Sequence, residues 1–219
     1  MALQSLTMIR HGESTANAEA AAAAGRAGAE EYDKGPRDPD IALTELGRKQ
    51  AAAVGDWLAE QDRPPTSVLC SPFLRARETA DIALRSVRTP RVRYDERLRD
   101  RDVGLLWGLT ALGIRRRYPL EHRERERMGR FYYRPPGGES WTDVALRLRS
   151  LLRELDGDVL VFAHDNVVVL TRYILEELDE PTVLRIESTQ LPNASITRWE
   201  RGESGLVPAL YGEVGHLPR

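Results

Sequence analysis

An arginine and a histidine stand side by side where the first apolar run of the chain ends. Arg10, His11, Gly12 and Glu13 directly follow the apolar residues 6–9. A guanidinium next to an imidazole at a strand exit can hold that imidazole against an anion. A glycine there lets the backbone come close to the anion, because it has no Cβ. With other cations nearby, His11 is a candidate nucleophile toward phosphorus, whereas an isolated Arg-His-Gly-Glu fits a solvated loop.

Three later segments carry residue types suited to the same chemistry. Residues 71–80 place Arg75 near the start of a predicted helix, where free backbone N–H groups and the helix dipole favour an anion. His164 and Asp165 follow a second strongly apolar run, and residues 135–140 form a Pro- and Gly-rich turn that leads into a helix. A single arginine on a helix, or a single histidine after a strand, more often has only a structural role. The prediction of a phosphate site therefore rests on the combination of these residues.

The elements that must position these residues alternate between strand and helix. Apolar runs indicate strands, and helical spacing of apolar residues indicates helices. Thr44 and Ser140 have the residue types of helix N-caps, and Pro72 suits the first turn of a helix. The expected strands are residues 3–9, 67–70, 92–94, 159–163 and 194–199, and the expected helices are residues 16–24, 44–61, 72–84, 140–155 and 166–178.

Continuous apolar strands separated by amphipathic helices predict an α/β protein with a mostly parallel sheet covered on both faces. Ligands of such sheets gather outside the carboxyl ends of the strands. His11, Ser71 and His164 each follow a predicted strand, so the fold is expected to bring them to one edge. No repeat or linker divides the chain, which predicts a single domain over residues 1–219.

Composition limits the other classes of function. The chain has 219 residues, a formal net charge of -2 and one cysteine, Cys70. A nearly balanced charge gives no general case for nucleic acid or an anionic membrane. A lone cysteine excludes an internal disulfide, and the four histidines follow no metal-binding pattern. No apolar run reaches the ~20 residues of a membrane span, and no signal-peptide pattern is present. A soluble, cytoplasmic protein is therefore expected.

The order of the motifs resembles the histidine phosphatase superfamily, the group that also contains the cofactor-dependent phosphoglycerate mutases. The likeness covers residues 8–197. It rests on Arg-His-Gly-Glu-Ser at residues 10–14, on Asn17, on residues 43–51 and 71–80, on Gly-Gly-Glu-Ser at 137–140, on His164 and on Asn-Ala-Ser at 193–195. It implies a three-layer α/β/α sandwich of the phosphoglycerate mutase type.

The same resemblance implies a mechanism. His11 would attack phosphorus and become a phosphohistidine, with its other ring nitrogen donating to a backbone carbonyl. Arg10 and Arg75 would fork onto phosphate oxygens, and His164 would add a donor, as imidazolium when phosphate is bound. Asn17 and Ser14 would complete the phosphate site, although both residues also suit the cap of the following helix. No metal is required, because arginines and imidazoles supply the positive charge.

The proton donor is where the sequence departs from the family pattern. The family usually has a Glu four residues before a Gly in this region, and here Asp100 stands four residues before Gly104. An Asp is one methylene shorter and needs a raised pKa to act as an acid near neutrality. Asp165 is the alternative donor, because the acid-phosphatase branch uses a His-Asp pair there; Asp165 also suits a helix N-cap.

Residues 105–137 are expected to form a helical or loop lid over the pocket. Its charged run has alternating Glu and Arg, which is typical of a solvated helix face, but its arginines could also bind a second phosphate or a carboxylate. The candidates for contact with the substrate are Arg115, Arg116, Arg130 and Tyr133.

These observations favour a metal-independent phosphomonoester hydrolase that acts on a small phosphorylated substrate and needs no cofactor. A cofactor-dependent phosphoglycerate mutase is the alternative, and it would require 2,3-bisphosphoglycerate. A non-catalytic phosphate-binding protein is a third reading. The protein is expected to be a monomer or a homodimer. The tail from residue 206, with Tyr211 and His216, could fold back over the site or extend freely, and the second is expected, because chain ends often do.

Overall fold

The computed structural model describes residues 2–33, 35–85, 87–203 and 205–217. A six-stranded sheet forms its centre, with the strand order β3-β2-β4-β1-β5-β6. The strands are β1 (Leu3–Arg10), β2 (Ser67–Cys70), β3 (Val92–Tyr94), β4 (Gly157–Ala163), β5 (Ile196–Gly202) and β6 (Gly205–Glu213). Strands β3, β2, β4 and β1 run parallel, and β5 and β6 are antiparallel, so the expectation of a mostly parallel sheet is confirmed.

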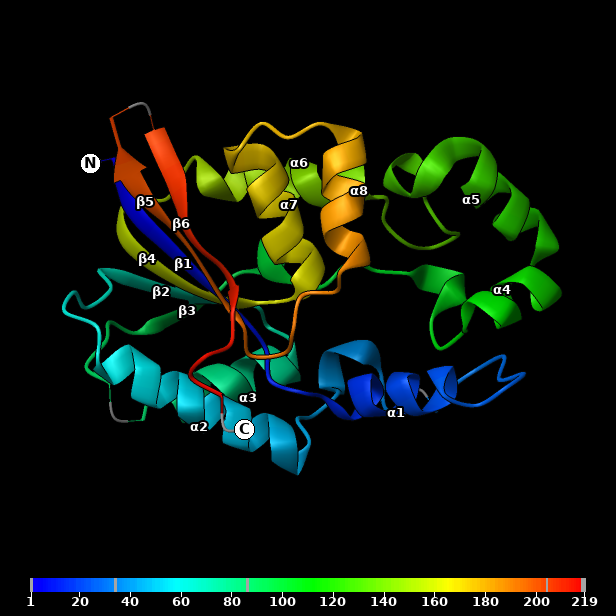
Figure 1. The fold of residues 1–219 in the computed structure, drawn as a ribbon, viewed down its shortest axis with the longest axis horizontal. Coiled ribbons are helices and arrows are strands. Elements are labelled where there is room, and N and C mark those ends of the chain that lie inside the picture. The colour runs from blue at the N-terminus through cyan, green and yellow to red at the C-terminus, as the bar shows by residue number, and fades with distance from the viewer. Residues whose placement is uncertain (1, 34, 86, 204, 218–219) are drawn as a thin grey trace.

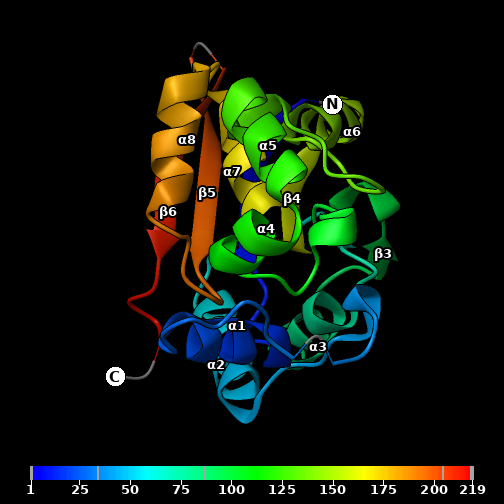
Figure 2. The same ribbon diagram turned by 90° about the vertical axis from the view of Figure 1, so that its right-hand side faces the viewer.

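Helices cover both faces of the sheet (Figures 1 and 2). Helices α6 (Trp141–Leu152), α7 (Asp165–Leu175) and α8 (Glu180–Ser188) lie on one face, and α2 (Glu45–Ala59) and α3 (Leu74–Ala83) lie on the other. Side chains alternate between the two layers along β4. Val161 belongs to the first core and Phe162 to the second. The predicted three-layer sandwich is therefore present.

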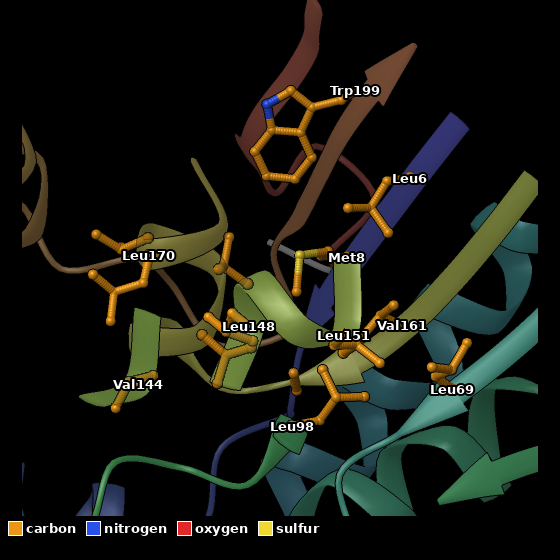
Figure 3. Close-up of a cluster of buried hydrophobic side chains, with 14 of the residues drawn as sticks. Leu6, Met8, Leu69, Leu98, Val144, Leu148, Leu151, Val161, Leu170 and Trp199 are labelled. Carbon is orange, nitrogen blue, oxygen red and sulfur yellow. The ribbon is translucent and has the colours of Figure 1, made fainter. Parts of the chain in front are cut away.

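The larger core joins the sheet to helices α6 and α7 (Figure 3). Leu6 and Met8 of β1 and Trp199 of β5 are almost completely buried there, against Leu148 of α6 and Leu170 of α7. Burial of side chains of this size contributes about 1.5–3 kcal/mol each. This packing fixes the strands, and with them the loops that follow their carboxyl ends.

Most helix boundaries agree with the sequence predictions. Thr44 caps α2 through Gly47, and Ser140 caps α6 through Asp143, both as expected. Helix α1 (Thr15–Ala24) also agrees. Pro72 differs, because α3 begins at Leu74 with Phe73 as its N-cap, so the proline precedes the first turn instead of occupying it.

The expected lid region is largely helical. It holds a short 3-10 turn, η3 (Gly104–Leu106), followed by α4 (Ala111–Arg117) and α5 (Pro119–Tyr132). Both helices lie to the right of the sheet in Figure 1. They enclose a small apolar cluster of their own, made by Leu106, Ile114 and Tyr133. That this segment acts as a lid stays a prediction.

The expectation of a free C-terminal tail is wrong. Residues 205–213 form β6, which pairs with β5 at the edge of the sheet. The Arg172 guanidinium lies 4.1 Å from the centroid of the Tyr211 ring, and His216 Nε2 lies 3.1 Å from the backbone oxygen of Ala194. Strand pairing and these side-chain contacts offset the entropy that a chain end gains by staying free. Within the described residues, no helix is long and apolar enough to cross a membrane.

Gly47 allows the loop after β1 to pack against the start of α2. A Cβ on Gly47 would lie 2.0 Å from the backbone oxygen of Glu13, two residues from His11. We therefore expect Gly47→Ala to lower the free energy of unfolding by about 2 kcal/mol or more, since the backbone must shift. Chemical denaturation would measure the loss. Gly25→Ala is the control, because its Cβ would meet no atom closer than 3.7 Å and the residue is already right-handed helical. An equal effect of the two substitutions would contradict this reading.

Candidate active site

Three neighbouring strands bring their following residues to one edge of the sheet. In the strand order β2-β4-β1, Ser71 follows β2, His164 follows β4 and His11 follows β1. The His11 N–H bonds to the oxygen of Ala163, and the Ser71 N–H bonds to the oxygen of Phe162. The ring centroids of His11 and His164 are 5.1 Å apart, with the rings edge to face. The predicted meeting of these residues is confirmed.

The hydrogen bonds of His11 determine which ring nitrogen carries the proton. Nδ1 lies 2.7 Å from the backbone oxygen of Gly12, and a carbonyl can only accept, so Nδ1 is the donor, as the resemblance implied. Nε2 accepts a bond of 3.3 Å from Nε of Arg75. The lone pair of Nε2 therefore faces the cations of the site. This is the tautomer that a nucleophile at Nε2 needs.

Burial keeps His11 uncharged. The ring is 2% exposed. Desolvation lowers its pKa well below the ordinary value, and the nearby charges of Arg75, His164 and Arg10 lower it further. The imidazole is thus neutral at physiological pH, and its lone pair is available for attack without prior loss of a proton.

Arg75 is the centre of the charge network. It lies in the first turn of α3 and its side chain is 5% exposed. Besides its bond to His11, it donates through Nη1 to Oδ1 of Asp38 at 2.8 Å and through Nη2 to Oδ2 of Asp100 at 2.9 Å. It does not pair with Glu78 on its own helix, since Glu78 binds Arg48. The guanidinium therefore faces the site.

His164 is held in place by a serine. Its Nε2 lies 2.8 Å from the hydroxyl oxygen of Ser71, which ties the end of β4 to the end of β2. Its Nδ1 is buried, forms no hydrogen bond, and lies 3.5 Å from Oδ2 of Asp100. Burial is the largest cause of its lowered pKa, followed by the charges of Arg75 and Arg10. The imidazolium form stays a prediction for the phosphate-bound state.

Arg10 completes the set of cations on the other side of His11. Its Nη1 donates to the backbone oxygen of Leu191, and its Nη2 lies 3.5 Å from Oδ2 of Asp165. Its Nε is buried and without a hydrogen-bond partner in the described structure. Buried donors are rarely left unpaired in folded proteins. Arg10 Nε is thus an unpaired donor of the site, which an oxyanion would satisfy, and the buried Nδ1 of His164 is likewise without a hydrogen-bond partner among the described residues.

The two candidate proton donors occupy different places. Asp100 contacts both Arg75 and His164, and its side chain is 22% exposed. Asp165 contacts Arg10, and its Oδ1 accepts from the backbone N–H of Asn166. The N-cap of α7 is His164, and Asp165 is the first helical residue, so the N-cap interpretation of Asp165 is wrong. The geometry favours Asp100, because it lies between the two groups nearest to the nucleophile.

Ser14 and Asn17 form the cap of α1. Ser14 Oγ accepts from the Asn17 N–H, and Asn17 Oδ1 accepts from the Ser14 N–H at 3.2 Å. Asn17 Oδ1 also accepts from Asn193 Nδ2 at 3.1 Å, and the same nitrogen donates to the backbone oxygen of His11 at 3.2 Å. Asn193 therefore links this cap to the nucleophile. A direct role of Ser14 or Asn17 in phosphate binding stays a prediction.

Asp38 is a member of the site that the sequence analysis did not single out. It opens the 3-10 turn η1 (Asp38–Asp40), and both its side chain and its backbone oxygen accept from Nη1 of Arg75. Burial raises its pKa, which Arg75 lowers in part and the charge of Asp100 raises again. Its position in a Gly- and Asp-rich loop gave no sequence signal, because the contact depends on how that loop folds back over α3.

The four lid candidates fall into different environments. Arg115 is exposed on α4, and Arg116 pairs with Glu30 at 2.9 Å. Arg130 pairs with Glu187 of α8. Tyr133 is 3% exposed, and its hydroxyl donates to Glu121 at 2.7 Å. Arg116, Arg130 and Tyr133 thus have structural partners, and contact of any of the four with a substrate stays a prediction.

Arg101, which directly follows Asp100 in the chain, lies close enough to two other arginines for their charges to act on it. Burial, and then the charges of Arg125 and Arg130, lower the pKa of Arg101. Arg125 has its own pKa lowered by burial and by Arg130, and within the described part of the chain it forms no ion pair. Cations that repel one another in a half-buried place are stabilised by an anion. No three His, Cys, Asp or Glu side chains of the described residues are grouped so that they could hold a metal ion.

Comparison with known proteins agrees with this geometry. The family described as the histidine phosphatase superfamily (branch 1) matches residues 6–213. A 2,3-bisphosphoglycerate-dependent phosphoglycerate mutase 2 of Gloeobacter violaceus is 31% identical over 195 residues, which are 85% of this chain and 80% of that protein. A 6-phosphofructo-2-kinase/fructose-2,6-bisphosphatase of Caenorhabditis elegans is 35% identical over 75% of this chain. The match spans only 32% of that longer protein.

Solved structures show the same architecture. The mycobacterial glucosyl-3-phosphoglycerate phosphatase in complex with VO3 superimposes with a TM-score of 0.74 and 28% identity, over 96% of this chain and 100% of that chain. YhfR of Bacillus stearothermophilus gives a TM-score of 0.76 at 25% identity, over 98% of this chain and 99% of that chain. With the family match over nearly its whole length, this chain belongs to the histidine phosphatase superfamily.

Proposed function

We propose that the protein is a metal-independent phosphomonoester hydrolase that forms a phosphohistidine on His11. The observation that supports this most is the state of His11. Its Nδ1 is committed to Gly12 and its Nε2 lone pair faces the Arg75 guanidinium, with His164 beside it. A neutral imidazole that points at fixed cations suits attack on an anionic phosphorus centre.

The proposed reaction has two steps. In the first, Nε2 of His11 attacks phosphorus, the bond from phosphorus to the leaving oxygen breaks, and Asp100 gives its proton to that oxygen. In the second, water attacks phosphorus, Asp100 takes the proton from the water, the bond from phosphorus to Nε2 of His11 breaks, and inorganic phosphate leaves. Arg10, Arg75 and His164 would hold the phosphoryl oxygens through both steps, where most of the catalysis of phosphoryl transfer arises.

The named relatives support an enzyme of this general kind. They include phosphatases, a bisphosphatase and phosphoglycerate mutases. We favour hydrolysis, because a mycobacterial glucosyl-3-phosphoglycerate phosphatase superimposes over 96% of this chain and 100% of its own length. The physiological substrate of this chain does not follow from that likeness.

The second candidate is a cofactor-dependent phosphoglycerate mutase, and the group of Arg101, Arg125 and Arg130 favours it. A mutase must hold a second anionic group, and Arg101, which directly follows Asp100, carries the same charge as the nearby Arg125 and Arg130. If the protein is a mutase, 2,3-bisphosphoglycerate is its cofactor. As a hydrolase it needs none. The monomeric or dimeric state and the cytoplasmic location stay predictions.

One experiment separates these two functions. Purified protein would be given p-nitrophenyl phosphate, and separately 3-phosphoglycerate with and without 2,3-bisphosphoglycerate. We expect release of inorganic phosphate that does not depend on the bisphosphate. Formation of 2-phosphoglycerate that requires the bisphosphate, with little free phosphate, would instead establish a mutase. No turnover of either compound would contradict a broad phosphatase and favour a binding protein.

The assignment of Asp100 gives a separate prediction. The p-nitrophenolate anion leaves without needing a proton, so Asp100→Asn is expected to keep a burst of one equivalent of p-nitrophenolate per enzyme. The following steady state should be slower by about 10²-fold or more, because water then lacks its base. With an alkyl phosphate the burst should also be lost. Rapid-quench kinetics would measure both phases.

Asp165→Asn is the matched comparison, since it removes the same charge from the Arg10 side of the site. We expect a loss of less than about tenfold, with both phases still visible, because Asp165 contacts neither Arg75 nor His164 in the described structure. If Asp165→Asn instead loses the steady state and Asp100→Asn does not, the proton transfer belongs to Asp165.

A further inference from the structure

The Asp38 carboxylate occupies donors of Arg75 that the proposed phosphate site requires. Arg75 has five N–H groups. One points to His11, two of Nη1 go to the side chain and the backbone oxygen of Asp38, and one of Nη2 goes to Asp100. A phosphoryl group cannot fork onto this guanidinium while both carboxylates hold it. Asp100 has a proposed part in the reaction, whereas Asp38 has none so far.

We infer that Asp38 competes with the substrate's phosphate for Arg75, and that this carboxylate must be neutralised by a proton for phosphate to bind. This inference rests on the proposed function, because it concerns the same phosphate site. Asp38 would be a residue that sets when the site accepts an anion, and it would not itself touch the reacting atoms.

The balance of charge at the site supports this competition. Two guanidinium groups, Arg10 and Arg75, face three carboxylates, Asp38, Asp100 and Asp165. Both imidazoles are uncharged, since burial lowers the pKa of each. With Asp100 protonated as the proposed acid, the carboxylates of Asp38 and Asp165 cancel the charges of the two guanidinium groups, and a phosphate dianion would bring an excess of negative charge. Like charges at these distances in a half-buried place oppose binding strongly.

Proton uptake by Asp38 would relieve the repulsion. Four groups face its carboxyl: Arg75 from α3, Asp100 and Asp102 from the segment before η3, and Tyr32 from the loop after α1. Burial is the largest cause that raises the pKa of Asp38, and the two other aspartates raise it further. An approaching phosphate acts in the same direction. Asp38 is therefore the carboxyl that we expect to take up a proton when phosphate arrives.

The turn that carries Asp38 does not depend on its charge. The backbone oxygen of Asp38 accepts from Nη1 of Arg75 at 2.9 Å. Within the turn, the N–H of Asp40 donates to Arg37 at 2.8 Å. Both bonds remain when the carboxylate is replaced by an amide. Asp38→Asn is therefore expected to fold, and to differ mainly in charge.

The test measures the affinity for inorganic phosphate by isothermal titration calorimetry between pH 5 and 8.5, for the wild type, Asp38→Asn and Asp40→Asn. Asp40 belongs to the same turn, pairs with Arg37 on the surface, and supplies the same change of charge as a control. We expect Asp38→Asn to bind phosphate roughly tenfold more tightly at pH 8, because a repelling charge is gone. The difference between the two affinities should shrink as the pH falls, because the wild-type carboxyl then takes up its proton more readily. Asp40→Asn should follow the wild type throughout.

A second measurement uses the wild type alone. Titrations in two buffers of different ionisation enthalpy give the number of protons taken up with phosphate. We expect uptake above that of phosphate's own ionisation, and we expect Asp38→Asn to lose this excess. A merely structural role of Asp38 would change neither the proton count nor the pH dependence.

The outcomes distinguish a failure of the inference about Asp38 from a failure of the proposed phosphatase function. Equal or weaker binding by a folded Asp38→Asn, or no excess proton uptake by the wild type, would overturn the inference and leave the phosphatase proposal intact. Absence of phosphate binding by the wild type and by Asp40→Asn would overturn both, because the site would then not be a phosphate site.

Discussion

His11→Ala is expected to abolish phosphate release from p-nitrophenyl phosphate, with kcat lower by about 10³-fold or more. The reason is that the substitution removes the group that we propose as the nucleophile. The substitution leaves Arg10, Arg75 and His164 in place, so inorganic phosphate should still bind. Steady-state turnover and calorimetry on the same preparation would measure the two effects separately.

Trapping of the intermediate makes this prediction sharper. Rapid-quench samples of the wild type should show one added phosphoryl group by intact-mass spectrometry, and the group should be lost in acid, as expected for a phosphohistidine. His11→Ala should show none. His122→Ala is the control, because His122 lies on α5 and pairs with Glu126. Retention of turnover in His11→Ala, or a phosphoryl group elsewhere, would exclude His11 as the nucleophile.

Arg75→Ala is expected to cause the next largest loss, about 10²- to 10⁴-fold in kcat/KM. Removal of one partner from a buried ion pair costs about 3–5 kcal/mol, because the other charges remain without their partner. Here two carboxylates, Asp38 and Asp100, would face each other without the cation that separates them. We also expect weaker binding of phosphate and a lower melting temperature. Kinetics, calorimetry and thermal unfolding would measure these three changes.

Two further variants test the cause of that loss. Arg77→Ala removes a guanidinium from the exposed face of the same helix, where it lies 5.6 Å from the centroid of the Tyr94 ring, and should leave kcat/KM nearly unchanged. Arg75→Lys keeps the positive charge but loses the pair of parallel N–H donors of the guanidinium. Its kcat/KM should therefore lie between those of Arg75→Ala and the wild type. If Arg75→Ala and Arg77→Ala behave alike, Arg75 is not part of the phosphate site.

The positive charge of the site comes from arginine side chains that neighbouring residues hold in place. The guanidinium of Arg75 is held by Asp38 and Asp100. The guanidinium of Arg10 is held by the backbone oxygen of Leu191 and by Asp165. Fixed donors of this kind need no rearrangement when charge develops in the transition state. The same contacts create the competition that we infer for Asp38, because a donor held by a carboxylate is not free for a substrate.

The sequence by itself determined the fold class and the identity of the central residues. Continuous apolar runs predicted which strands are buried on both faces of the sheet. This prediction needs only the sequence of the strand itself. The caps at Thr44 and Ser140 were also predictable, because a cap depends on residues three apart. His11, Ser71 and His164 could be placed at one edge because each directly follows a strand, and parallel strands end on the same side.

Only the tertiary structure decided the contacts between segments that are distant in the chain. Asp38 meets Arg75 because a loop without periodic pattern folds back onto α3. Residues 205–213 join the sheet because they pair with the edge of β5. No local sequence pattern predicts this pairing, because it depends on where β5 lies in the folded chain. Arg116 and Arg130 are engaged by Glu30 and Glu187 for the same reason. Local patterns fix which backbone forms a strand or a helix, but the partner of a charged side chain depends on which surfaces the folded chain brings together.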